Sequence, residues 1–345
     1  MWGQGVVRVG RRASDFRLDG VGSDGASWKL AAGAASFRGM DHRIDPELLA
    51  VLPYLPTVDI AEPAAFRAAQ RARAAQPLQR PDGLLVEDRV VAGGVPVRIY
   101  TPKAAAEAGG VLGVLVWFHG GGFVFGDMDS TDGSCVATAL EVGCVVVNVE
   151  YRLAPEDPFP AGFDDAWAAL RWVAEHAASI GADAGRIAVG GVSAGGGLAA
   201  ALALRARDEG GPALVYQVLD TAVLDDRLDT PSMREFDATP LWSRPQAELS
   251  WRYYLAGAEA SAYAAPARAE DVANLAPAYI TANEFDPLRD EAIEYAVRLI
   301  RAGVPVELHH RPGTFHGSNA IPSAEVSRRA LEDIRRALRA AFRAG

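Results

Sequence analysis

The segment Gly191-Val192-Ser193-Ala194-Gly195 constrains the fold of this 345-residue chain more than any other feature. It directly follows the apolar run Ile187-Ala188-Val189, which is typical of a buried strand. Glycines on both sides of a serine suit a sharp strand-to-helix turn, because side chains there would collide with the adjoining strand and helix. Such a turn lifts the hydroxyl clear of the backbone. The pattern therefore predicts a strand–turn–helix unit with Ser193 as a candidate nucleophile.

The rest of the chain alternates between strand-like and helix-like patterns. Two alternating runs, 84–91 and 95–100, predict a hairpin joined through Gly93-Gly94. Further strands are expected over 111–118, 144–149, 187–189, 214–219, 278–281 and 304–309, and helices over 163–180, 194–208, 287–302 and 326–342. Continuous apolar strands that alternate with helices indicate an α/β fold, in which helices cover both faces of a mostly parallel sheet.

Residues 224–264 break this alternation. They are polar at first and then carry six aromatic side chains, Phe236, Trp242, Trp251, Tyr253, Tyr254 and Tyr263. An insertion that follows a strand lies above the carboxyl ends of the strands, where ligands of open α/β sheets bind. We expect these side chains to form the core of a lid, with some of them lining an apolar pocket.

The N-terminal part of the chain reads differently. Residues 1–39 are rich in Gly, Ser and Arg and show weak periodicity. They are interpreted as a disordered tail, as a segment upstream of a true start at Met40, or as an extra piece of lid. The first two interpretations are favoured because chain termini often lack order. From about residue 44 to 76 the pattern is helical and rich in alanine, and it is broken by Pro53, Pro56 and Pro63.

Composition excludes several classes of protein. The net charge of −10 argues against nucleic acid as a general partner, because phosphate neutralisation needs a basic face. Two cysteines, Cys135 and Cys144, cannot make a disulfide framework, and no Cys/His cluster has zinc-ligand spacing. We expect two buried free thiols and no metal site. No apolar stretch could span a bilayer and no secretory signal is apparent, so a cytoplasmic location is expected.

A second glycine-rich segment, His119-Gly120-Gly121-Gly122-Phe123, directly follows the strand that ends at Phe118. Three glycines leave the backbone bare, so that N–H groups can converge on the oxyanion of a tetrahedral intermediate. Gly121 and Gly122 are the preferred donors, Gly120 is the alternative, and Ala194 supplies a third N–H. His119 is expected to shape this loop. A phosphate cradle is disfavoured, because the segment lacks both a G-K-[ST] ending and a G-x-G-x-x-G pattern.

The orienting acid of a serine nucleophile is expected after a later strand. Asp286 lies just beyond the strand 278–281, at the entrance of a helix. An Asp before a proline also suits a plain helix N-cap, so both interpretations remain open. Glu284 and Asp290 are the rival carboxylates. Asp290 falls inside the expected helix and is expected to pair with an arginine.

The general base is expected in the loop after the last strand, where His316 lies. His309 and His310 are the local rivals, but they end a strand and are expected to be structural or exposed. His316 has a glycine neighbour and can reach Ser193 from a loop. The resulting order, serine, acid and histidine, is the order found in α/β-hydrolases.

Five segments together carry a resemblance to a known family: His119–Phe123 (HGGGF), Tyr151–Glu156 (YRLAPE), Gly191–Gly196 (GVSAGG), Asp286–Glu291 (DPLRDE) and His316-Gly317. On these segments the chain closely resembles the hormone-sensitive-lipase family of microbial esterases (bacterial family IV), which includes arylacetamide-deacetylase-like enzymes. The resemblance extends from about residue 41 to the C-terminus.

This resemblance implies an α/β-hydrolase core of residues 81–222 and 265–345. It also implies a helical cap, built from N-terminal helices within 40–80 and from the insertion 223–264. Carboxylesterase activity without a cofactor and a homodimer formed through the sheet edge are further implications.

Three positions depart from the family pattern. Val192 stands where an Asp is usual, Gly197 where an Asn is usual, and Ser318 where a bulky aromatic side chain is common. The Val192 difference removes a carboxylate that would tie the serine turn to nearby loops, but it removes no proton-transfer group. Ser318 would widen the pocket near the base.

The expected activity is that of a serine carboxylesterase, which hydrolyses short-chain or aryl esters through an acyl-enzyme on Ser193. An amidase or deacetylase acting on aryl amides is the alternative among enzymes. A non-catalytic small-molecule receptor on the same fold is the alternative from another class, and the retained His316 argues against it. The candidate lining residues of the substrate pocket are Phe123, Trp242 and Phe315.

Overall fold

The computed structural model describes residues 42–73, 81–107 and 110–344. The extension 1–39 and the candidate start at Met40 lie outside the described residues. Of the segment 40–80, the description includes residues 42–73, with the short helix α1 (Pro46–Leu49) and the helix α2 (Pro63–Arg73).

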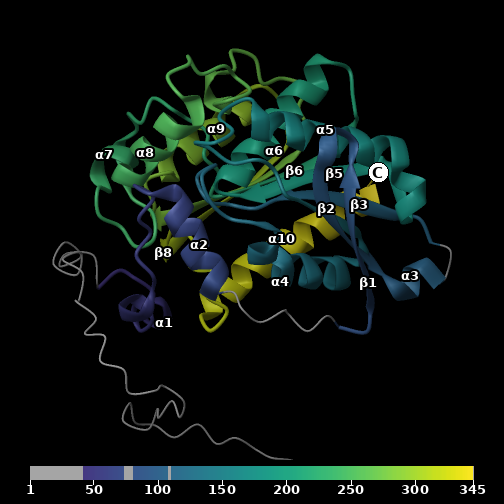
Figure 1. The fold of residues 1–345 in the computed structure, drawn as a ribbon, viewed down its shortest axis with the longest axis horizontal. Coiled ribbons are helices and arrows are strands. Elements are labelled where there is room, and N and C mark those ends of the chain that lie inside the picture. Colours follow the sequence, from purple (N-terminus) through teal and green to yellow (C-terminus); the bar gives the residue numbers. More distant parts are fainter. Residues whose placement is uncertain (1–41, 74–80, 108–109, 345) are drawn as a thin grey trace, which may run out of the picture.

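An eight-stranded sheet forms the centre of the molecule (Figure 1). Its strands are β1 (Leu84–Val91), β2 (Val95–Pro102), β3 (Leu112–Phe118), β4 (Val145–Val149), β5 (Ala182–Val192), β6 (Leu214–Asp220), β7 (Ala278–Phe285) and β8 (Val306–Phe315). They are ordered β1-β2-β4-β3-β5-β6-β7-β8. β2 pairs antiparallel with β1 and β4, and the other neighbours are parallel. The predicted hairpin and the mostly parallel sheet are therefore confirmed.

Helices cover both faces of the sheet, as Figure 1 shows. In the described residues the α-helices besides α1 and α2 are α3 (Lys103–Glu107), α4 (Met128–Thr138), α5 (Ala161–His176), α6 (Ala194–Asp208), α7 (Pro231–Glu235), α8 (Arg244–Leu255), α9 (Arg289–Arg301) and α10 (Glu325–Ala344). The apolar cluster on one face includes side chains of α5, α6 and α9, and the cluster on the other face includes side chains of α4 and α10.

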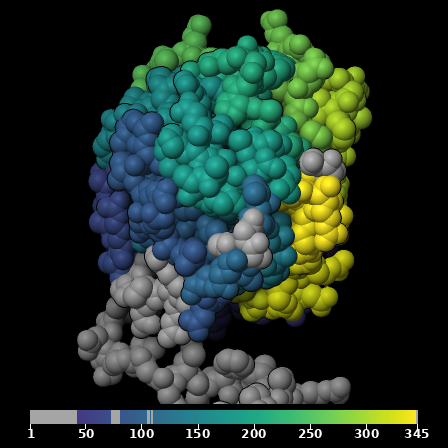
Figure 2. Space-filling model, turned by 90° about the vertical axis from the view of Figure 1, so that its right-hand side faces the viewer, coloured from purple at the N-terminus to yellow at the C-terminus, as the bar shows by residue number. Residues whose placement is uncertain are grey.

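The pleat of the strands divides the core between these two layers. In β3, Val114 and Val116 belong to the cluster on the α5–α6 side, whereas Leu115 and Trp117 belong to the cluster on the α4–α10 side. This two-sided burial explains why β3 reads as a continuous apolar run. Seen from the side (Figure 2), residues early in the chain lie on one flank and the C-terminal residues on the other.

Several elements differ from the sequence expectation. β5 and β7 extend beyond the expected 187–189 and 278–281, and the differences at β8 and α4 have clear physical causes. β8 runs to Phe315, because Asn283 and Phe285 of β7 continue the pairing beyond the expected end at His309. The helix α4 has no apolar periodicity that would predict it. Its start is defined by a capping box, in which the Asp127 carboxylate accepts from the backbone N–H of Ser130 at 2.9 Å.

The insertion contributes α7 and α8, and α8 contacts the N-terminal segment. The hydroxyl of Tyr253 donates to the carbonyl oxygen of Ala61 at 3.0 Å, and the side-chain amide of Gln246 donates to that of Val58 at 3.1 Å. Two segments that are far apart in the sequence thus meet above the sheet.

Cys135 and Cys144 are free thiols and both are buried, as the sequence predicts. Within residues 42–73, 81–107 and 110–344, no helix combines the length and the apolar character that crossing a membrane requires.

Replacing Leu338 by alanine tests the packing of α10. Leu338 is fully buried, and truncation of a buried leucine lowers the free energy of unfolding by about 2–5 kcal/mol. Ile300→Ala is the matched control, because Ile300 is 53% exposed. It should change this free energy by no more than about 0.5 kcal/mol. Chemical denaturation measures both values, and equal effects would contradict the assignment of Leu338 to the core.

Candidate active site

The backbone at Ser193 makes the sharp turn that the glycine pattern predicts. Ser193 lies between the end of β5 and the start of α6, with a φ of 57° and a ψ of −119°. Its N–H donates to the carbonyl oxygen of Asp220 at 2.8 Å, and its own carbonyl accepts from the N–H groups of Gly197 and Val223 at 3.1 and 3.0 Å. These bonds hold a non-glycine residue in a region of φ/ψ space that is costly to occupy.

Close backbone packing explains the two flanking glycines. A Cβ at Gly191 would lie 2.3 Å from the carbonyl carbon of Gly195, and a Cβ at Gly195 would lie 2.1 Å from the carbonyl oxygen of Phe118. Both distances are far shorter than van der Waals contact. The serine turn therefore tolerates only glycine at these two positions.

The structure brings Ser193, His316 and Asp286 together. His316 Nε2 lies 3.0 Å from Ser193 Oγ, and His316 Nδ1 lies 2.7 Å from Asp286 Oδ2. The three residues come from the β5–α6 turn, from the segment after β7 and from the segment after β8. Their residual exposures are only 5% for Ser193, 7% for His316 and 1% for Asp286. This geometry suits proton transfer from the hydroxyl to the imidazole.

The Asp286 carboxylate contacts His316 but does not cap α9, whose N-cap is Leu288. One carboxylate oxygen faces His316, and the other accepts from the backbone N–H of Leu288 at 2.9 Å. The rival carboxylates are engaged elsewhere. Glu284 accepts from the N–H of Gly313 at 2.8 Å, and Asp290 pairs with Arg289 at 2.7 Å, as expected for Asp290.

The rival histidines, His309 and His310, make no hydrogen bond with Ser193 in the described part of the chain. His309 Nε2 lies 2.7 Å from the carboxylate of Glu307, and His310 is exposed on the edge strand β8. Both are therefore structural or exposed, as the sequence predicts.

The glycine loop after β3 lies against the serine turn. A Cβ at Gly120 would lie 3.3 Å from Ser193 Cβ. Gly121 and Gly122 have φ values of 122° and 57°, and the carbonyl of Gly121 accepts from the N–H groups of Val124 and Phe125 at 2.9 and 3.0 Å. A Cβ at Gly121 would lie 2.0 Å from the carbonyl oxygen of Phe125. The loop thus folds back on itself beside Ser193, in a conformation that favours glycine.

His119 supports this loop from within the core. Its side chain is fully buried, stacks on the ring of Tyr151 at 4.2 Å and has Nδ1 2.7 Å from the carbonyl oxygen of Gly120. The Tyr151 hydroxyl donates to the carbonyl of His119 at 2.8 Å. Burial lowers the pKa of His119 to about 4, so that the imidazole is neutral at physiological pH.

Aromatic side chains of the insertion cover the glycine loop. A Cβ at Gly122 would lie 2.4 Å from the ring of Trp242, and the Trp242 ring centre is 6.0 Å from that of His316. Phe123 stacks on Tyr254 of α8 at 3.9 Å. Phe315 is instead fully buried in a separate cluster with Phe285 and Leu48 (Figure 1 shows the end of β8 near α1). A pocket role for Phe315 stays a prediction.

The three departures from the family pattern have distinct surroundings. Val192 packs against the apolar cluster on the α4–α10 side of the sheet. A Cβ at Gly197 would lie 2.3 Å from the carbonyl oxygen of Val223, so this backbone arrangement excludes any larger residue there. Ser318 is buried, and its carbonyl accepts from the Ser327 hydroxyl at 2.7 Å.

Three polar side chains at the site are not among the sequence candidates: Asp220, Ser250 and Asn319. The Ser250 hydroxyl donates to the carbonyl oxygen of Gly122 at 2.5 Å, and the Asn319 amide donates to the carboxylate of Asp220. A local signal exists only for Asp220, because it directly follows the expected strand 214–219 at its carboxyl end.

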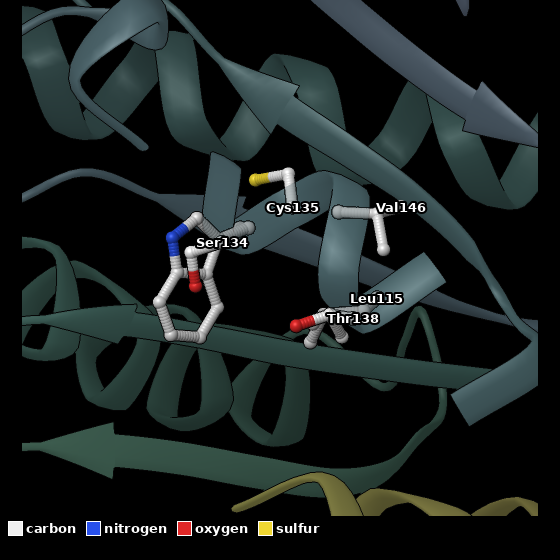
Figure 3. Close-up of a pocket in the computed structure, with 6 residues that line it drawn as sticks. Leu115, Ser134, Cys135, Thr138 and Val146 are labelled. Atoms are coloured by element: carbon white, nitrogen blue, oxygen red, sulfur yellow. The ribbon is translucent and has the colours of Figure 1, made fainter. Parts of the chain in front are cut away.

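A small hollow lies on the α4 side of the sheet (Figure 3). It is lined by Leu115, Trp117, Ser134, Cys135, Thr138 and Val146. It includes none of the residues grouped around Ser193 and leaves no room for a water molecule. Burial raises the pKa of the Cys135 thiol well above its ordinary value, which makes this cysteine unreactive. The hollow therefore reflects the packing of α4 on β3 and β4.

The fold and the grouped serine, histidine and aspartate together define an α/β hydrolase. Residues 115–319 match the Abhydrolase_3 family, which is described by its alpha/beta hydrolase fold, and the chain belongs to this family.

Known proteins resemble the chain over most of its length. It is 42% identical over 307 residues to esterase LipI of Mycobacterium tuberculosis, which covers 85% of this chain and 94% of that protein. It is 40% identical over 316 residues to carboxylesterase NlhH of the same species, with 86% and 97% covered. The solved structure of a bacterial heroin esterase matches with a TM-score of 0.83 and 47% identity, over 88% of this chain and 99% of that one.

The burial of His119 predicts a pH dependence of stability. Its folded pKa of about 4 lies below the value of about 6.5 expected in the unfolded chain. Between these pH values the unfolded chain binds a proton that the folded chain does not, so stability falls as the pH is lowered. Between pH 6.5 and pH 4.5 the free energy of unfolding of the wild type should fall by up to about 1.4 kcal/mol per pH unit. In His119→Gln this part of the fall should be absent.

Denaturation curves at several pH values measure this difference. His310→Gln is the control, because His310 is exposed, and it should keep the wild-type dependence. If His119→Gln also keeps it, a buried neutral His119 is ruled out.

Proposed function

We propose that Ser193, His316 and Asp286 hydrolyse carboxylic esters through an acyl-enzyme. The enzyme is a carboxylic ester hydrolase, like the relatives named esterase and carboxylesterase. His316 takes the hydroxyl proton as Ser193 Oγ attacks the ester carbonyl, and Asp286 stabilises the resulting imidazolium. The imidazolium then protonates the leaving alcohol. The unbroken chain of hydrogen bonds from Ser193 through His316 to Asp286, of 3.0 and 2.7 Å, carries this proposal.

Deacylation uses the same groups in the same order. His316 takes a proton from water, which attacks the acyl carbonyl, and then returns the proton to Ser193 as the acid leaves. No metal or redox group is required at any step of this scheme.

The N–H groups of Gly121, Gly122 and Ala194 are the proposed donors to the oxyanion. Ala194 is the first residue of α6, so its N–H has no partner within the helix and points from the positive end of the helix dipole. Gly121 and Gly122 have no side chains of their own that could cover these N–H groups. Gly120, where an added Cβ would lie 3.3 Å from Ser193 Cβ, is the alternative donor. Together these N–H groups would stabilise the charge that develops on the carbonyl oxygen.

Short-chain or aryl esters are the proposed substrates. Trp242 of the insertion lies against Gly122 and near His316, and Phe123 stacks on Tyr254. Ser193 itself is only 5% exposed. A small or flat acyl group fits between aromatic rings at lower cost than a long flexible chain.

Two further expectations stay predictions. The family resemblance supports a homodimer formed through the sheet edge, where β8 is the outer strand. The two buried free thiols are in line with a reducing compartment such as the cytoplasm.

Replacement of the proposed nucleophile or base should abolish hydrolysis. Ser193→Ala and His316→Gln should each lower kcat on p-nitrophenyl acetate by at least about 1,000-fold, because the two residues act as a unit. The exposed His310→Gln variant is the matched control and should retain wild-type kcat. Full hydrolysis by Ser193→Ala would refute the assignment.

A substrate panel separates the esterase from its alternatives. We expect kcat/KM to be highest for short p-nitrophenyl esters and to fall with acyl length, and to be lower for the matched p-nitroanilides. Anilides hydrolysed faster than esters would favour the amidase or deacetylase. Absence of both hydrolysis and covalent labelling of Ser193 by a fluorophosphonate would favour the receptor.

A further inference from the structure

Asp220 connects the serine turn to the segment that carries the base. It is the last residue of β6 and is 5% exposed. Its carbonyl oxygen accepts from the N–H of Ser193 at 2.8 Å. In the parallel register it lies beside Val192 on β5 and Thr281 on β7. The main chain of Asp220 is therefore part of the support of the nucleophile.

The side chain of Asp220 reaches the segment after His316. One carboxylate oxygen accepts from the Thr281 hydroxyl at 2.5 Å, and the other accepts from the side-chain amide of Asn319. The Thr281 hydroxyl oxygen in turn accepts from the N–H of Thr221 at 2.9 Å. Both carboxylate oxygens thus have donors, which a carboxylate this deeply buried requires.

Asn319 lies in the short 3-10 turn Ser318–Ala320, which begins two residues after the base. Gly317 separates His316 from this turn and has a φ of 77°. The N–H of Ala320 donates to the carbonyl of Gly317 at 3.0 Å. A displacement of Asn319 would therefore be transmitted through one short turn to the backbone of His316.

The segment before the base has a separate anchor. The Asn283 amide donates to the carbonyl of Phe315 at 2.9 Å, and the Thr314 hydroxyl donates to the Asn283 side chain at 2.9 Å. Asp286 holds only the imidazole, at Nδ1. The Asp220–Asn319 hydrogen bond is thus the counterpart of the Asn283 anchor on the other side of His316.

We infer that Asp220 is a positioning residue for the base, which acts through Asn319 to keep His316 within hydrogen-bond distance of Ser193. The inference rests on the proposed function, because it assigns Asp220 to the same reaction. Asp220 does not touch the reacting atoms. It ties the serine turn, through its carbonyl, and the base segment, through its carboxylate, to one residue of a buried strand.

The charges around Asp220 are in keeping with this role. Burial raises the pKa of its carboxyl group, and the Thr281 hydrogen bond and the nearby charges of Arg311 and His316 oppose that rise. Tyr279 also lies close enough to sense the Asp220 charge. Val192, its neighbour on β5, contributes no polar side-chain atom, so the carboxylate at this point comes from β6.

Removal of the donor or the acceptor tests the tether. In Asp220→Ala the acceptor is removed, and in Asn319→Ala the donor is removed. Asp220→Asn alone is not sufficient, because the amide of Asn319 can turn over and accept from the new N–H group instead. We expect each alanine variant to lower kcat on p-nitrophenyl acetate by about 10- to 100-fold, because a base displaced by 1 Å can cost as much. KM should stay within twofold.

The double variant Asp220→Asn/Asn319→Asp restores the hydrogen bond with the roles exchanged. It should recover kcat to within about threefold of the wild type, and the shape of the profile of kcat against pH should be unchanged. Asp183→Asn is the control, because Asp183 lies near the opposite end of β5 and pairs with Arg186. Wild-type kcat in Asn319→Ala, or a loss that the double variant does not recover, overturns the inference.

Two readouts keep the inference separate from the proposed function and from folding. Thermal unfolding identifies a variant that fails to fold, and Asn319→Ala removes a side chain that is only half-buried. The rate of fluorophosphonate labelling of Ser193 follows base positioning without any ester. If the wild type is labelled but hydrolyses no ester, the proposed substrate is wrong. In that case, slower labelling of Asn319→Ala and recovery of the labelling rate in the double variant still support the role of Asp220.

Discussion

Three main-chain hydrogen bonds hold Ser193 in a backbone conformation that an L-residue rarely adopts. Its N–H donates to Asp220 on β6, and its carbonyl accepts from Gly197 in α6 and from Val223 at the start of the insertion. A conformation of this kind costs roughly 1–3 kcal/mol and persists only where the surroundings over-determine it. The strand, the helix and the insertion must therefore all be in place before the hydroxyl points at the imidazole.

The crowding that stabilises this turn also accounts for the glycines of two distant motifs. A Cβ at Gly195 would collide with the end of β3, and a Cβ at Gly121 would collide with the loop that follows it. Both glycines lie where the chain passes close to itself beside Ser193. Their sequence patterns are recognisable because the requirement is steric and falls on single residues. A requirement of that kind is visible in the sequence as a glycine at a fixed position, independently of the rest of the fold.

The same reasoning explains what the sequence predicts and what it does not. β3 and β4 begin and end within one residue of the expected bounds, because strands buried on both faces are apolar throughout. α4 and the second half of β8 depend on a cap and on edge pairing, which have no apolar period. The candidate site residues carry local motifs. Asp220 and Asn319, which are 99 positions apart, meet because β6, β7 and β8 are neighbours in the sheet and the turn of Asn319 follows β8.

Contact between the insertion and the glycine loop would couple substrate size to the geometry of the proposed oxyanion donors. The Ser250 hydroxyl holds the carbonyl of Gly122 at 2.5 Å, and the Trp242 ring lies against the same residue. Ser193 itself is only 5% exposed, so a bound acyl group would lie close to these side chains. A bulky acyl group that displaces Trp242 or Ser250 therefore also disturbs the N–H groups proposed to bind the oxyanion. Such a substrate would be hydrolysed more slowly because an oxyanion donor is misplaced, as well as because space is lacking. Discrimination against bulky acyl groups would therefore lower kcat as much as it weakens binding.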